Sequence, residues 1–151
     1  MSIIKSLGTW LLTVIVTYAI AATLATQSVL ARLSEMGIPI SLGQRFSTTI
    51  QDIIGMGSMF LPLVAFSLLI AFVVAAILTR WLRPWRTALF VLAGAVGLLA
   101  LHIVLEAMLG ITPVAAARTI GGLLMQGAAG AIGGWLFVRM NPREPDITAT
   151  G

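Results

Sequence analysis

The residues with the strongest capacity for chemistry lie near the junction of two apolar stretches. His102 and Glu106 are four positions apart, so on a helix they share one face. Arg118 follows in the next stretch, where antiparallel packing would bring it to the depth of Glu106. Gln126 lies two turns further on. Because polar and ionisable side chains are costly to bury in lipid, these four residues are the main functional candidates.

This polar cluster has three interpretations. A Glu106–Arg118 ion pair beside His102 would pin the helical hairpin and leave no charge unpaired near lipid. Alternatively, histidine titrates near neutral pH, so a histidine beside a carboxylate could form a proton- or ion-responsive group. The cluster could also contact a partner subunit. For Gln126 we expect a hydrogen bond between helices, with a place along a hydrated path as the second interpretation.

The residue types exclude several other kinds of chemistry. The chain has no cysteine and one histidine, which rules out disulfides, a bis-histidine haem and a zinc site of ordinary composition. It contains neither a Gly-Lys-Ser/Thr phosphate loop nor a Gly-x-Ser-x-Gly nucleophile elbow. We therefore predict no catalytic residue, no cofactor and no metal, and expect a protein that is not an enzyme.

The composition predicts that these residues lie within a membrane protein. Hydrophobic residues make up 59% of the chain and charged residues only 9%, whereas a soluble domain carries about 25% charged residues. So few charges cannot cover a water-facing surface, but a surface in lipid needs no such covering. The net charge of +4 is then interpreted as a topology signal, and we expect no nucleic-acid partner.

Four apolar stretches are long enough to cross about 30 Å of hydrocarbon, which takes about 20 helical residues. They cover about residues 7–31, 58–79, 87–109 and 113–139, the last starting at Pro113 after Thr112. The short connections between the last three predict antiparallel neighbours. The sequence therefore predicts an all-α integral membrane protein with four transmembrane helices, forming a single domain over residues 1–140. Residues 141–151 are expected to be a disordered cytoplasmic tail.

The segment between the first two stretches has a helical pattern of its own. Ser41 can cap a helix over about residues 41–54, whose apolar residues gather on one face and which is too short to span. Gly55 and Gly57 follow it and predict its end. The pattern indicates one amphipathic interfacial helix, lying at the membrane surface or folded over the bundle.

The basic residues give the orientation. With the N-terminus inside, six positive residues fall on the cytoplasmic side and three on the other, which predicts a bacterial-type inner membrane with both termini cytoplasmic. The cytoplasmic topology anchors are Arg80, Arg83, Arg86 and Arg139. As an alternative, the first stretch resembles a cleavable signal peptide. Cleavage would leave three spans in the same orientation.

The fourth stretch is rich in small residues. Gly130 and Gly134 form a small-xxx-small pair, and Gly121 and Gly127 extend the pattern. In lipid, small residues let helix backbones approach closely. We expect them to pack within the bundle; the alternative is a contact with a partner or a second copy.

These observations favour a non-enzymatic accessory or scaffold subunit. It would sit in the lipid bilayer and associate with a larger membrane protein through its Gly/Ala-rich helices. The alternative is a small homo-oligomeric transporter or channel, in which the polar cluster of His102, Glu106, Arg118 and Gln126 lines or gates the path.

Overall fold

The fold is described by a computed structural model that covers residues 3–110 and 114–142. In these residues there are no strands, and the predicted all-helical class is confirmed. The four long helices are α1 (Ile3–Glu35), α2 (Leu42–Leu78), α3 (Arg86–Leu109) and α4 (Ile120–Met140), with short 3-10 turns η1 (Arg83–Trp85) and η2 (Ala115–Arg118). All four are long and apolar enough to cross a membrane, consistent with a multi-pass membrane protein.

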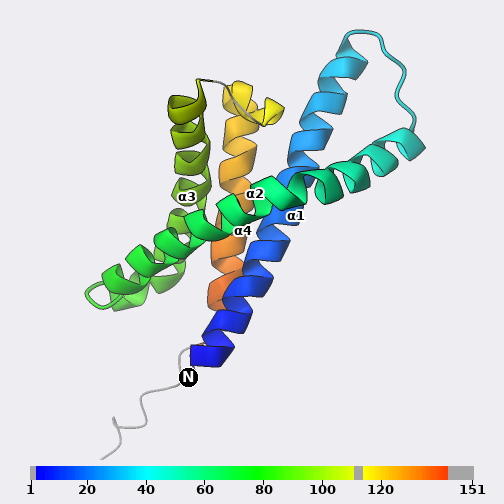
Figure 1. The fold of residues 1–151 in the computed structure, drawn as a ribbon. Coiled ribbons are helices and arrows are strands. Elements are labelled where there is room, and N and C mark those ends of the chain that lie inside the picture. Colours follow the sequence, from blue (N-terminus) through cyan, green and yellow to red (C-terminus); the bar gives the residue numbers. More distant parts are fainter. Residues whose placement is uncertain (1–2, 111–113, 143–151) are drawn as a thin grey trace, which may run out of the picture.

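The helices alternate in direction along the chain. Figure 1 shows α3 and α4 side by side, with α2 crossing the other helices obliquely. Helix α1 packs against α2 and α4, while α3 packs against α2 and most extensively against α4. The predicted α2–α3 and α3–α4 neighbours are therefore present. We call the end where α1 and α3 begin, and where α2 and α4 end, the basic end.

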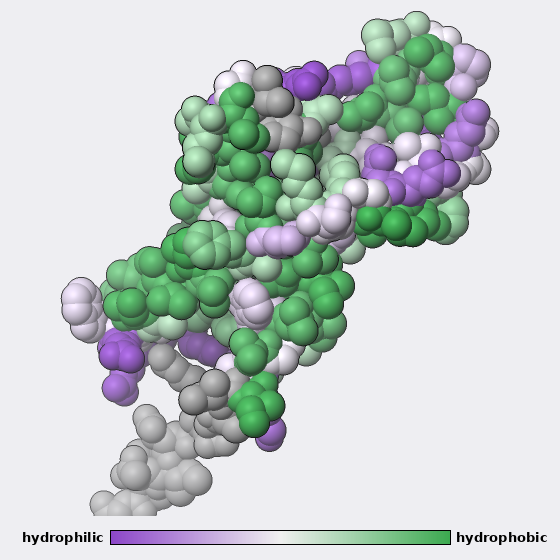
Figure 2. All heavy atoms as spheres, in the orientation of Figure 1, coloured by the Kyte–Doolittle hydropathy of each residue, from purple (hydrophilic) through white to green (hydrophobic). Residues whose placement is uncertain are grey.

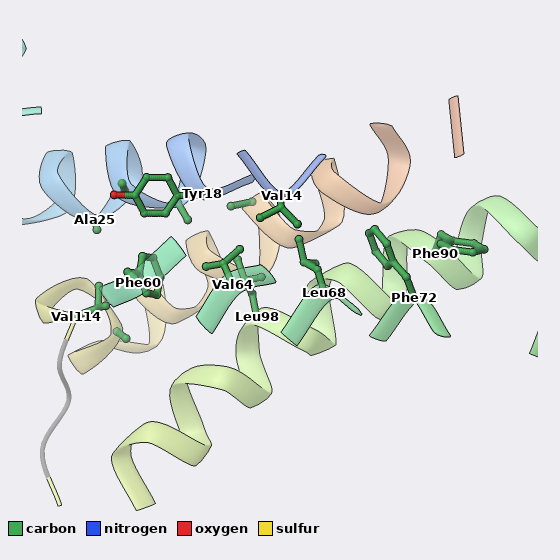
Figure 3. Close-up of a cluster of buried hydrophobic side chains, with 14 of the residues drawn as sticks. Val14, Tyr18, Ala25, Phe60, Val64, Leu68, Phe72, Phe90, Leu98 and Val114 are labelled. Carbon is green, nitrogen blue, oxygen red and sulfur yellow. The ribbon is translucent and has the colours of Figure 1, made fainter. Parts of the chain in front are cut away.

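The core forms where α2 crosses the bundle. Phe60, Val64, Leu68 and Phe72 are buried at every fourth position of α2, which places them on one face of the helix. Figure 3 shows these side chains near Val14 and Tyr18 of α1 and Leu98 of α3. One stripe of α2 therefore holds the bundle together, and the rest of its surface is left largely exposed.

The predicted break between an interfacial helix and the second span is wrong. The predicted cap is present, because the Ser41 hydroxyl accepts from the backbone of Gln44, whose side chain accepts from Ser41 N–H in return. However, α2 then runs without interruption through Gly55, Gly57 and Pro62. A helical glycine costs only about 1 kcal/mol relative to alanine, so packing along α2 overrides the two glycines.

The predicted start of the fourth helix is also wrong. Thr112 and Pro113 lie outside the described residues, and α4 begins only at Ile120. Thr119 is its cap: its backbone is extended and its hydroxyl accepts from the N–H of Gly122 at 3.2 Å. The extended residue separates η2 from α4, so Arg118 precedes the helix and does not lie inside it.

Candidate functional site

Two of the four predicted polar residues meet inside the bundle. His102 on α3 is 2% exposed and Gln126 on α4 is fully buried, with 3.4 Å between His102 Nε2 and Gln126 Oε1. Gln126 Nε2 also donates to the carbonyl of Ala21 on α1 at 3.0 Å. Because its amide faces both neighbours, Gln126 links three helices at the centre of the fold.

The surroundings of this pair are dry and mostly apolar. The imidazole of His102 lies 5.7 Å from the ring of Phe60, centre to centre. Since Gln126 Oε1 can only accept, the contact requires a proton on Nε2. His102 Nδ1 is buried and has no hydrogen-bond partner in the described part of the chain. Such an arrangement can fix helix positions, but almost none of its surface is open to a path for water or ions.

The other two predicted residues, Glu106 and Arg118, are both exposed, and among the described residues no ion pair joins them. Residues 106–110 at the end of α3 are all exposed, so no helix covers the last turn. Arg118 lies in η2 because the start of α4 is delayed. The structure therefore brings His102 to Gln126 and separates both from the two charged residues.

A second polar group, which the sequence analysis did not assemble, joins α1 to the first part of α2. The Thr26 hydroxyl lies 2.7 Å from Asp52 Oδ2, and Gln27 Nε2 donates to Thr49 Oγ1 at 2.9 Å. Arg45 donates to Gln27 Oε1 at 3.3 Å. We call these five residues the polar seam. The group was not predicted because its members lie on two helices, and the sequence does not show that α1 and the first part of α2 run side by side.

The glycines of α4 differ in what they contact. A Cβ added at Gly130 would overlap the backbone carbonyl of Gly94 on α3, and one at Gly134 would overlap the carbonyl of Phe90. At Gly127 the Cβ would meet the side chain of Leu99 at 3.2 Å. Gly121 has nothing within 4 Å. Three of the four predicted packing glycines thus lie against α3, within the chain itself.

A fifth glycine of α4 was not among those predicted to pack. A Cβ at Gly133 would overlap the Thr17 hydroxyl of α1, and the Thr17 hydroxyl has no hydrogen-bond partner among the described residues. Gly133 and Gly134 are adjacent in the sequence, but Gly133 faces α1 and Gly134 faces α3.

The four predicted topology anchors all lie at the basic end. The Arg86 guanidinium donates to the backbone carbonyl of Asn141 at 2.7 Å and lies 5.7 Å from the ring centre of Phe90. Arg139 lies 5.8 Å from the Trp135 ring, while Arg80 and Arg83 are exposed. Arg86 is therefore built into the bundle end, whereas Arg80 and Arg83 project from it.

The described residues contain no group of three or more histidines and carboxylates placed to hold a metal ion. No model of a known protein family matches the chain, and neither a curated protein nor a solved structure matches it.

Proposed function

We propose that this chain is a non-enzymatic accessory or scaffold subunit of the inner membrane, bound to a larger membrane protein. The observation that carries the proposal is an apolar stripe on an arm of the fold. The arm consists of residues 24–35 of α1 and 42–57 of α2, joined by the polar seam. Figure 1 shows the connection between α1 and α2 projecting away from α3 and α4. The α1 part of the arm still contacts α4, because Ser28 Oγ lies 3.4 Å from Met125 Sδ and Arg32 donates to the Thr119 hydroxyl at 2.8 Å.

The apolar stripe occupies one side of the arm. Leu42, Phe46, Ile50 and Ile54 recur at every fourth position of α2. Phe46 is 70% exposed and Ile54 is 75% exposed. Exposed apolar patches bordered by polar residues are typical of interaction sites. The polar seam supports this interpretation, because it holds the segment against α1 and keeps the stripe turned outward.

The orientation that we propose places both termini in the cytoplasm. The basic end carries Lys5 and the four anchors, whereas the opposite end has Arg32, Arg45 and Arg118. An excess of basic residues favours the cytoplasmic side. Trp81, Trp85 and Trp135 are exposed near the basic end and fit an aromatic belt at a membrane interface.

The alternative, a homo-oligomeric transporter or channel, is less well supported by the geometry. Its path would need polar side chains turned toward a cavity or a symmetry axis. His102 and Gln126 are instead packed against each other and closed off from solvent. The small residues of α4 are also used largely within the chain, so they offer little surface for a second copy. For the same reason we no longer place the contact with a larger partner on the Gly/Ala-rich helices, and we place it on the arm instead.

Photo-crosslinking in the native membrane tests the proposal. A photoreactive amino acid is placed at Phe46 or Ile54, and the matched control position is Leu92, an exposed leucine of α3. We expect Phe46 and Ile54 to yield the same protein adduct, of one defined mass, and Leu92 to yield none.

The other outcomes decide against the proposal. Lipid adducts alone at both arm positions would contradict a protein partner. An adduct of twice the chain mass, containing only this protein, would favour the homo-oligomeric alternative.

A further inference from the structure

A crevice opens at the basic end, where all four long helices converge. Its volume is about 420 Å³, within the range of about 300–1,000 Å³ typical of small-ligand sites. Most of its wall is apolar or aromatic, formed by Leu7, Trp10, Leu69, Phe72, Val73, Phe90 and Phe137. A wall of this kind suits a hydrocarbon chain.

The rim of the crevice carries a fixed positive charge. Arg86 lines it, and its guanidinium is positioned by the Asn141 carbonyl and by the ring of Phe90. Arginine stays charged at all physiological pH values, and its planar donors match phosphate oxygens. The hydroxyl residues Ser6 and Thr79 also line the crevice. The site therefore combines an apolar wall with an anion-binding group at its edge.

Two residues of the crevice wall have unused hydrogen-bonding atoms. Trp10 Nε1 is a donor and Asn141 Oδ1 an acceptor, and neither has a hydrogen-bond partner among the described residues. Asn141 is only 2% exposed. A buried polar atom without a partner is energetically unfavourable. A ligand head group with both an acceptor oxygen and a hydroxyl would meet both needs.

We infer that this crevice is a binding site for an anionic phospholipid whose head group carries hydroxyls. The phosphate lies on Arg86, an acyl chain follows the apolar wall, and the head-group oxygens face Trp10 and Asn141. Basic pockets between membrane helices on the cytoplasmic side bind such head groups. Figure 2 shows hydrophilic surface beside apolar surface at this lower end of the molecule.

The inference rests on membrane insertion and on the charge of the basic end, but not on the partner that we propose for the arm. A neutral phosphatidylcholine offers neither a net negative charge nor a hydroxyl donor. The inference therefore predicts selectivity for phosphatidylglycerol over phosphatidylcholine.

Native mass spectrometry of the full chain measures this selectivity directly. The purified protein in detergent micelles is supplied with equal amounts of dioleoyl phosphatidylglycerol and dioleoyl phosphatidylcholine. We expect one phosphatidylglycerol to be retained preferentially. Arg86→Gln should weaken that binding about tenfold, since it removes the charge that holds the phosphate. Arg83→Gln is the charge-matched control and should bind like the wild type, because Arg83 does not line the crevice.

A second pair of variants tests the crevice itself and leaves every charge in place. Val73 lines the crevice, whereas the adjacent Val74 lines a separate groove between α2 and α3. Both valines are about half-exposed, so tryptophan can be accommodated at either position. Val73→Trp should fill the crevice and lower phosphatidylglycerol retention about tenfold, while Val74→Trp should leave it unchanged.

Three outcomes would overturn the inference: equal retention of the two lipids, equal loss in Arg83→Gln and Arg86→Gln, or unchanged retention in Val73→Trp. If Arg86→Gln fails to fold, the Val73 and Val74 variants decide the question alone. Failure of the crosslinking experiment on the arm would leave these results unaffected, so the two proposals can fail separately.

Discussion

The contact between α3 and α4 leaves no room for a single methyl group, and this gives the sharpest stability prediction. A Cβ at Gly130 would overlap the Gly94 carbonyl and lie 3.2 Å from the backbone nitrogen of Ala95. These atoms belong to the backbone of α3, so they cannot rotate away as a side chain would. Gly130→Ala must therefore push the two helices apart.

The magnitude follows from two opposing effects. Forcing an extra methyl group into a packed interior costs about 1–3 kcal/mol, and separating the helices also loosens the Gly134–Phe90 contact. Alanine regains up to about 1 kcal/mol through its higher helix propensity. We expect the free energy of unfolding to fall by about 2 kcal/mol. Gly121→Ala is the matched control on the same helix: nothing lies within 4 Å of its Cβ, so only the propensity gain remains.

Unfolding by sodium dodecyl sulfate in mixed micelles, followed by circular dichroism, measures both variants. The two should differ by about 3 kcal/mol, with opposite signs relative to the wild type. A Gly130→Ala variant that unfolds like the wild type would contradict the close backbone contact between α3 and α4. So would a Gly121→Ala variant that is destabilised as much as Gly130→Ala. Combining Gly94→Ala with Gly130→Ala adds a check: the second methyl should cost less than the first, because both disturb one contact.

Two further predictions concern the polar residues, both measured by the same unfolding assay. Gln126→Met keeps the side-chain volume but removes the link to α1 and leaves His102 without its partner, so the free energy of unfolding should fall by about 1 kcal/mol. An unchanged value would mean that the buried amide contributes nothing to stability. Glu106→Gln and Arg118→Gln should each change the free energy of unfolding by less than about 0.5 kcal/mol, because both side chains are exposed and unpaired with each other. A large loss in both would show that the two residues pair after all.

The helices themselves were predictable because the apolar stretches are long and nearly free of charge. The errors arose where local signals compete. Gly55 and Gly57 suggested an end to a helix. However, the buried side chains that begin at Phe60 pack α2 into the core, and this packing outweighs a small loss of helix propensity. Pro113 suggested a helix start, yet the hydroxyl of Thr119 provides the actual cap six residues later.

The sequence indicated which polar residues belong to the candidate site, but not how they are arranged. His102 and Gln126 were singled out because polar side chains are expensive in an apolar helix, but their meeting depends on the rotation of α3 against α4. That rotation is set by which glycines face which neighbour, and the periodicity of α4 cannot resolve it because small residues occur all around the helix. The predicted Glu106–Arg118 pair failed for a related reason: it assumed that α4 extended back to Pro113.

The helices differ in length relative to the hydrocarbon thickness of a membrane. At 1.5 Å per residue, α3 (24 residues) and α4 (21 residues) measure about 36 and 32 Å, close to the hydrocarbon thickness of about 30 Å. Helix α2, with 37 residues, measures about 55 Å. If it crosses a membrane, such a helix either tilts steeply or extends beyond the hydrocarbon.

The distribution of polar residues favours extension at the arm. The three α2 residues of the polar seam lie in the first third of that helix, and from Phe60 to Leu78 the helix has no charged residue. The sequence pattern that predicted an interfacial helix over residues 41–54 therefore marks the part of α2 that we place outside the hydrocarbon, even though no break separates it from the span. A continuous helix gives this part a rigid connection to the core at Phe60.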